Sequence, residues 1–152
     1  VSSSEAGLAL MEVVISVGLL VTLAAGLVQL FAMSAQSMVR ARHRTSALIL
    51  AVEKLEQIRA AAVTQGAVGL AGPAGSQTEY LDPQGRLVGS HVGAGPTGSR
   101  YERVWLVDQP FGTFGVVRVQ VVVAPIQAGV AVVPDAAAPP DGARVTTLVW
   151  SP

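Results

Sequence analysis

The pattern of hydrophobic and polar positions divides the chain into two parts. Residues 8–33 read LALMEVVISVGLLVTLAAGLVQLFAM, a run in which Glu12 is the only ionisable side chain. At about 1.5 Å per residue, a helix over this run is about 39 Å long and crosses a hydrocarbon core of about 30 Å with some tilt. Because a carboxylate at the bilayer centre costs about 2.5–3.5 kcal/mol, Glu12 is expected to have a positive partner or a functional role.

Beyond residue 40 the pattern becomes amphipathic. Apolar residues recur at steps of three and four, at Leu48, Ala51, Leu55, Ile58 and Ala62. Polar residues fall largely elsewhere, at Arg44, Glu53, Lys54, Gln57 and Arg59. This period predicts a helix over 40–63 with one stripe facing a core. Since neither Pro nor Gly occurs between residues 27 and 63, the two segments are predicted to form one continuous helix over 8–63.

The remainder of the chain predicts a small sheet. Residues 79–81 and 86–88 flank Asp82-Pro83-Gln84-Gly85, a turn sequence that predicts a hairpin. Further strands are predicted over 101–107, 115–124 and 144–150. In the second of these, the valines at 117, 119, 121 and 123 alternate with a face that carries Arg118 and Gln120. Gly/Pro-rich loops are predicted over 66–75, 89–99 and 125–142, and short connections favour an antiparallel meander.

These elements predict an α+β fold. A long N-terminal helix, membrane-spanning in its first half and amphipathic in its second, is expected to pack on an antiparallel sheet of four to five strands. The part outside the membrane has about 110 residues, which is enough for one core. The chain has no cysteine, which excludes disulfides and thiol chemistry, and its 10 basic and 10 acidic residues leave no net charge that indicates nucleic acid.

Three other interpretations of the apolar run remain open. A buried core helix of a soluble protein is usually shorter and seldom apolar all round. A cleaved secretory signal could use Ala32-Met33-Ser34 and release a chain that begins at Ala35, but its apolar part is usually about 7–15 residues. The third alternative is a single-pass anchor for an extracytoplasmic binding module that does not polymerise.

The start of the run carries a resemblance. Gly7-Leu8-Ala9-Leu10-Met11-Glu12-Val13 resembles the Gly-Phe-Thr-Leu-Ile-Glu-Val signature of bacterial type IV pilins and type II secretion pseudopilins, with Leu8 in place of the commoner phenylalanine. The resemblance covers about the first third of the chain. Residues 47–56, ALILAVEKLE, are also similar to the helix of minor pilins of the PilV type and of the small pseudopilin of the I class.

This resemblance implies a structural subunit, not an enzyme, with no cofactor or metal. A prepilin peptidase would cut after Gly7 and N-methylate Leu8. Residues 1–7 would then be a leader, 8–39 the transmembrane and assembly helix, and 40–152 an extracytoplasmic domain. Glu12, at the fifth position of the mature chain, would pair with the terminal amine of a neighbouring subunit.

The same resemblance implies partners and a location. The partners would be other pilin or pseudopilin subunits, the inner-membrane assembly platform and the lipid bilayer. The chain would lie in the inner membrane as a single-pass protein and then enter a pilus or pseudopilus. Lack of the C-terminal disulfide loop of many major pilins favours a minor subunit. By the positive-inside rule alone, however, Arg40, Arg42 and Arg44 would favour the opposite orientation.

Other candidate chemistry is sparse. His43 and His91, the two histidines, are expected to be solvated polar residues, and Trp105 and Trp150 are expected to pack in the sheet. No phosphate loop, zinc-ligand spacing or nucleophile elbow occurs in the sequence. The cluster Arg40, Arg42 and Arg44 is compatible with anionic lipid headgroups, with acidic groups on adjacent subunits, or with a solvated helix face.

Overall fold

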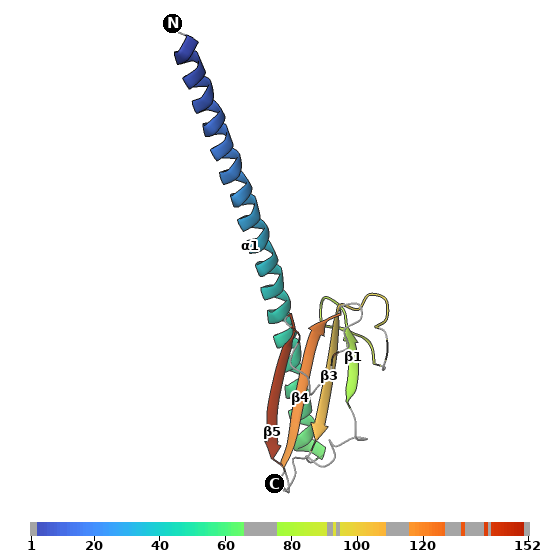
Figure 1. Ribbon diagram of the computed structural model, residues 1–152. Helices are drawn as coiled ribbons and strands as arrows, with labels where there is room; N and C mark the ends of the chain where they lie inside the picture. Colours follow the sequence, from blue (N-terminus) through green and yellow to red (C-terminus); the bar gives the residue numbers. More distant parts are fainter. Residues whose placement is uncertain are drawn as a thin grey trace. The chain divides into compact units, whose positions relative to one another are not determined.

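The computed structural model describes residues 3–65, 76–90, 93, 95–108, 116–126, 132, 139 and 141–150 (Figure 1). By its internal contacts the chain divides into two units, Val1–Val39 and Arg40–Pro152. The division falls where the sequence changes from apolar to amphipathic.

The single helix α1 extends over Ser3–Gln65, so the predicted continuous helix is confirmed. Its apolar positions up to Val39 face outward on all sides: every large hydrophobic side chain from Leu8 onward is between 53% and 73% exposed. The hydroxyl of Thr22 donates to the carbonyl of Gly18 at 2.7 Å, which satisfies this polar group within the helix. The first unit therefore contains no core of its own.

Within the second unit, α1 packs on the sheet through a stripe that differs slightly from the predicted one. Its buried members are Ala47, Leu50, Ala51, Leu55, Ile58 and Ala62. The prediction was wrong for Leu48, which is 47% exposed, and for Lys54, whose side chain is only 13% exposed and lies between the helix and the sheet. The stripe is rotated toward Ala47 and Leu50 because the small Ala47 and Ala51 allow the helix to approach the sheet closely.

Five strands form one antiparallel sheet, which confirms the predicted α+β class. They are β1 (Gln77–Leu81), β2 (Leu87–Gly89), β3 (Tyr101–Asp108), β4 (Val116–Pro125) and β5 (Ala143–Trp150). The order across the sheet is β2-β1-β3-β4-β5. The simple meander was therefore wrong, since β3 returns to pair with β1 and leaves the short β2 at the edge.

The β1–β2 hairpin forms as predicted. The Gly85 amide donates to the Asp82 carbonyl at 3.1 Å, and Asp82 Oδ1 accepts from the amides of Gln84 and Arg86, each at 2.8 Å. Gly85 has φ of +82°, a left-handed conformation that a glycine adopts without strain. This turn also lies close to the helix, because a Cβ on Gly85 would be 2.6 Å from Leu50 Cδ2.

The inner face of the sheet forms the core with α1. The predicted alternation in β4 is confirmed, since Val119, Val121 and Val123 are fully buried and Val117 is 3% exposed. Their inner-face neighbours include Leu81, Tyr101, Trp105 and Ala143. On the opposite face of β4, Gln120 is only 6% exposed, and it accepts a hydrogen bond from Arg144 Nη2 at 3.3 Å.

Several predictions fall partly or wholly outside the described residues. These are the loop over 66–75, His91 in the second loop, and most of the connection over 125–142.

Candidate functional site

The predicted processing and assembly residues lie in the first turns of α1. Gly7 is exposed, and a Cβ placed on it would meet nothing within 4 Å. Leu8 is 71% exposed, and Glu12, four residues further on, lies on the same side of the helix. Gly7 has helical backbone; because glycine has a low helix propensity, about 1 kcal/mol less favourable than alanine, the helix can open there at small cost.

Glu12 has no positive side chain near it along the helix. All ten Lys and Arg residues of the chain lie at position 40 or beyond. Arg40 is 28 residues from Glu12, about 42 Å along an α-helix. Along α1, no Lys or Arg of residues 1–152 therefore lies within reach of this carboxylate.

A second cluster of charged residues joins the helix to the sheet. Glu79 on β1 accepts a hydrogen bond from Lys54 Nζ at 2.7 Å through Oε1 and from Arg103 Nε at 2.9 Å through Oε2. Arg103 Nη1 also donates to the Leu50 carbonyl at 3.2 Å. The side chains of Lys54, Glu79 and Arg103 are 13%, 12% and 7% exposed. These bonds connect α1, β1 and β3 through one carboxylate.

The two cations determine the ionisation of Glu79. Burial alone raises the pKa of its carboxyl, but hydrogen bonds and charge attraction from Lys54 and Arg103 outweigh it and hold the pKa below the ordinary 4.5. Lys54 Nζ also lies 3.9 Å from the ring centroid of Trp105, a cation–π contact. A carboxylate that is ionised and bonded by two cations is a poor general base, so the cluster is structural.

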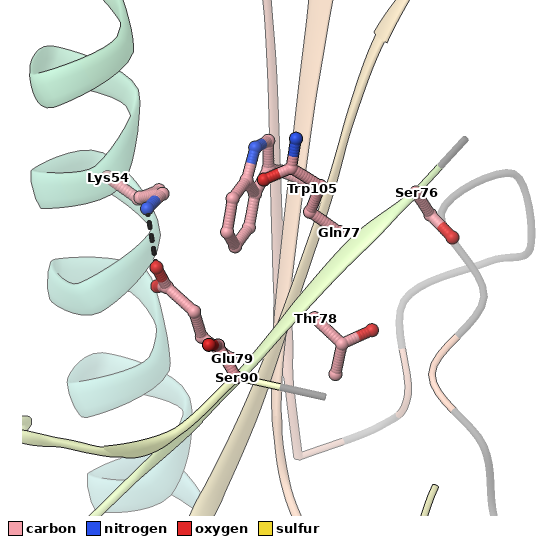
Figure 2. A pocket seen from close by; sticks show the side chains of 7 residues that line it. All are labelled: Lys54, Ser76, Gln77, Thr78, Glu79, Ser90 and Trp105. Atoms are coloured by element: carbon pink, nitrogen blue, oxygen red, sulfur yellow. Dashed lines mark hydrogen bonds and ion pairs between the residues drawn. The ribbon is translucent and has the colours of Figure 1, made fainter. Parts of the chain in front are cut away.

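A pocket of about 450 Å³ lies beside this cluster. Figure 2 shows Lys54 reaching from α1 to Glu79, next to the Trp105 ring. The remaining lining residues are Ser76, Gln77, Thr78 and Ser90, which offer hydroxyl and amide groups. Such a lining suits a small polar molecule and has no nucleophile paired with a base.

His43 is held more firmly than the sequence suggested. Its Nδ1 lies 3.2 Å from the Tyr101 hydroxyl, and its Nε2 lies 3.3 Å from Arg100 Nη2. Because a guanidinium only donates, Nε2 accepts and Nδ1 carries the ring proton. The prediction of a solvated histidine was therefore wrong for His43, which joins α1 to the start of β3.

The two tryptophans have opposite environments. Trp105 is 9% exposed and belongs to the core, as predicted. Trp150, at the end of the edge strand β5, is 72% exposed, so its expected packing in the sheet was wrong. No strand is paired to the outer side of β5 within the described residues.

The Lys54–Glu79–Arg103 cluster was not predicted from the sequence. Tyr101, Arg103, Trp105 and Val107 occupy every second position of a predicted strand and therefore share one face. This places an arginine on the core side. A buried guanidinium requires an acceptor, and this was the available signal. Which carboxylate supplies it depends on the strand pairing, because Glu79 is the Cα partner of Arg103 in the β1–β3 ladder.

Over the described part of the chain, no three His, Asp or Glu residues lie close enough to hold a metal ion. One helix, Leu10–Thr64, is long and apolar enough to cross a membrane, and none of its most apolar stretch is buried. Comparison of the chain with protein-family models, curated proteins and solved structures finds no match.

Proposed function

We propose that this chain is a structural subunit, of minor type, of a type IV pilus or a type II secretion pseudopilus. It is cut after Gly7 by a prepilin peptidase, methylated at Leu8, and assembled through its N-terminal helix. The domain from Arg40 onward is then displayed outside the inner membrane. The partners are other pilin or pseudopilin subunits and the assembly platform of the inner membrane.

The observation that carries this proposal is an isolated carboxylate in an apolar helix that has no core of its own. Residues from Leu8 to Val39 expose large hydrophobic side chains on every side, so the segment requires a bilayer, other helices or both. Glu12 is the only ionisable group between Leu8 and Val39 and has no positive side chain near it. A helix bundle in which each subunit provides a terminal amine satisfies both requirements.

The exposure of the segment also bears on two alternatives. A core helix of a soluble protein is mostly buried, whereas the most apolar stretch of α1 is not. A secretory signal is exposed in the same way but is removed, so the first residue of the mature chain separates it from a pilin. The resemblance predicts Leu8, and the signal interpretation predicts Ala35.

The experiment is mass spectrometry of the N-terminus in the membrane fraction, together with variants at Gly7 and Glu12. A methylated Leu8 is expected in the parent chain, and Gly7→Val should leave the leader attached. Glu12→Leu should insert and be cut but fail to co-purify with partner pilins. Glu12→Asp, which retains the charge on a shorter side chain, should retain part of the assembly.

The pocket beside Lys54 and Glu79 favours the second candidate, a monomeric membrane-anchored binding module. This alternative requires neither cleavage after Gly7 nor Glu12. In a single-pass monomer Glu12 is only a cost to insertion, so Glu12→Leu should insert at least as well and leave function intact. If the substituted chain assembles as well as the parent, the filament proposal is wrong.

A further inference from the structure

Four arginines lie together at the start of the second unit. Arg40, Arg42 and Arg44 are exposed on α1, and Arg100, which precedes β3, joins them through the 3.3 Å contact of its Nη2 with His43 Nε2. We call Arg40, Arg42, Arg44 and Arg100 the arginine collar. The sequence shows the first three, but the fold is needed to bring Arg100 to the same place.

The collar surrounds the helix. With about 3.6 residues per turn, Arg42 points about 200° away from Arg40, and Arg44 returns to within about 40° of it. The three positions extend over about 6 Å along the helix axis. A partner helix or a single acidic patch would contact one side only, whereas a ring of charge at one level fits a plane that the helix passes through.

The fold provides no anion for the collar. Five of the six other cations have acceptors inside the described part of the domain, the exception being Arg86: Arg103 and Lys54 bond Glu79, Arg59 bonds Glu56, Arg118 bonds Asp108 and Arg144 bonds Gln120. Among the described residues, no carboxylate lies within 4.0 Å of a collar guanidinium. From residue 13 to residue 52 the sequence contains no Asp or Glu.

The nearest acidic residue further along α1 is too distant to compensate. Glu53 lies nine residues after Arg44, the nearest collar residue on α1, which is about 14 Å along the helix. That exceeds the Debye length of about 8 Å at physiological ionic strength. The collar therefore presents uncompensated positive charge to whatever surrounds it.

The position of the collar identifies the surroundings. It begins directly after Val39, the last residue of the first unit and the last of its exposed large hydrophobic side chains. A bilayer of about 40–45 Å with a hydrocarbon core of about 30 Å has a headgroup layer of about 5–8 Å on each side. The 6 Å extent of the collar matches that layer.

We propose that the arginine collar binds the anionic phospholipid headgroups at the membrane surface where the apolar segment ends. This rests on the membrane insertion that the proposed function includes, but it is independent of cleavage after Gly7 and of polymerisation. The bound lipids are phosphatidylglycerol-like, with a phosphate that accepts from the guanidinium groups. They hold the start of the extracytoplasmic domain at the membrane surface.

The test measures lipid preference next to the collar in the full chain. Because the protein has no cysteine, Ala41→Cys provides a single labelling position on the exposed helix surface within the collar. The fluorophore-labelled chain is reconstituted in vesicles of phosphatidylcholine and phosphatidylglycerol. Brominated phosphatidylglycerol and brominated phosphatidylcholine are then compared as quenchers.

The proposal predicts that brominated phosphatidylglycerol quenches the fluorophore at residue 41 more strongly than brominated phosphatidylcholine does. Each arginine near an anionic surface contributes about fivefold to the binding of acidic lipid. The triple variant R40Q/R42Q/R44Q should therefore reduce the preference to about fivefold or less, the contribution of the remaining Arg100, and Arg100→Gln alone should lower it by up to about fivefold. High salt, with a Debye length of about 3 Å at 1 M, should weaken it in the parent chain.

Arg59→Gln is the matched control. It removes an arginine from the same helix, 19 residues after Arg40 and about 28 Å away along the axis. This variant should leave the lipid preference unchanged. An equal loss with Arg59→Gln would show a general effect of net charge and would overturn the assignment to the collar.

Other results would also overturn the proposal. These are equal quenching by the two lipids in the parent chain, loss of the preference when inorganic phosphate replaces chloride at constant ionic strength, and cross-linking of residue 41 to an acidic protein without a lipid preference. A fluorophore at Leu20→Cys, within the apolar segment, shows whether the helix is inserted in the membrane. It therefore distinguishes a wrong collar proposal from a lack of insertion. If iodide in solution quenches that label, insertion itself is wrong; if the label is protected but no preference exists, only the collar proposal fails.

Discussion

Glu12 lies in an apolar helical segment and Glu79 lies on a strand that packs against α1, and the two parts of the chain provide different partners for these carboxylates. Glu79 accepts hydrogen bonds from Lys54 and Arg103 and holds α1, β1 and β3 together. Glu12 has no positive side chain in the first unit at all. The domain from Arg40 onward satisfies its charges internally, whereas the segment before it depends on a bilayer or on other molecules.

The same contrast holds for apolar surface. Every buried hydrophobic residue among the described ones lies at Ala47 or beyond, while the large hydrophobic residues from Leu8 to Val39 are all more than half exposed. A domain with its own core folds alone, and a helix without one acquires its environment by insertion or assembly. Separating the two parts should therefore separate folding from membrane attachment.

The largest expected effect follows from removing residues 1–39. The domain 40–152 should be soluble, folded and free of membranes, because its core is complete without the apolar segment. Circular dichroism and size-exclusion chromatography without detergent provide the measurement, with the full chain in detergent as reference. Aggregation, or a spectrum of mostly disordered chain, would contradict the division into two parts.

The carboxylates provide the second comparison. Glu79→Gln should lower the free energy of unfolding of the domain by about 3 kcal/mol, because it leaves the buried Arg103 and the largely covered Lys54 without their counter-ion. Denaturant unfolding of domain 40–152 measures this loss. Glu56→Gln, which removes the exposed partner of Arg59, should cost less than about 0.5 kcal/mol.

Glu12→Gln completes this comparison in the full chain. It should leave the unfolding of the sheet domain unchanged in detergent, because Glu12 belongs to the first unit and the core of the domain lies in the second. A clear loss of domain stability with Glu12→Gln would show that the two parts are not independent.

Leucines on α1 provide the third comparison. Leu55 is 5% exposed in the core, so Leu55→Ala should cost about 2–4 kcal/mol in the unfolding of domain 40–152. Leu48→Ala, at a position that is 47% exposed, should cost less than about 1 kcal/mol. Equal losses would indicate that Leu48 is buried, as the sequence predicted, and would contradict the buried face of α1 that the structure shows.

The sequence was sufficient for elements with a strong local signal. The alternating valines of β4 specify one buried face, and the Asp82-Pro83-Gln84-Gly85 turn fixes the β1–β2 hairpin. The apolar run likewise predicts a helix able to span a membrane. Each of these depends on residues close together in the sequence.

Features that depend on distant residues were not predictable in this way. The polarity of Lys54 predicts exposure to solvent, but the side chain lies on the inner side of α1 because it bonds Glu79, 25 residues away, and contacts the Trp105 ring. Arg100 contacts His43, which lies 57 residues earlier in the sequence. Strand β3 pairs with β1, although β2 directly precedes it in the sequence. Periodicity does not specify which strand pairs with which, so the place of Arg100 in the collar and the charged cluster around Glu79 could be found only from the fold.

The smallest expected effect is the response of the domain to acid, in which two glutamates act in opposite directions. The pKa of Glu79 lies below its ordinary 4.5, so the folded state binds fewer protons than the unfolded state in the window below that value. Stability from Glu79 is complete above pH 4.5 and is lost as the pH falls further. Burial raises the pKa of Glu102, although the Val132 amide partly offsets this, so protonation of Glu102 adds stability above pH 4.5.

Unfolding of domain 40–152 as a function of pH should therefore show a slight rise in stability on acidification toward pH 4.5 and a fall below it. Glu79→Gln should remove much of the fall, because the charge that is lost on protonation is already absent. Glu102→Gln should remove the rise and leave the fall. A fall that persists unchanged in Glu79→Gln would mean that other carboxylates control the acid response, and that the charged cluster contributes less to the domain than its three buried side chains indicate.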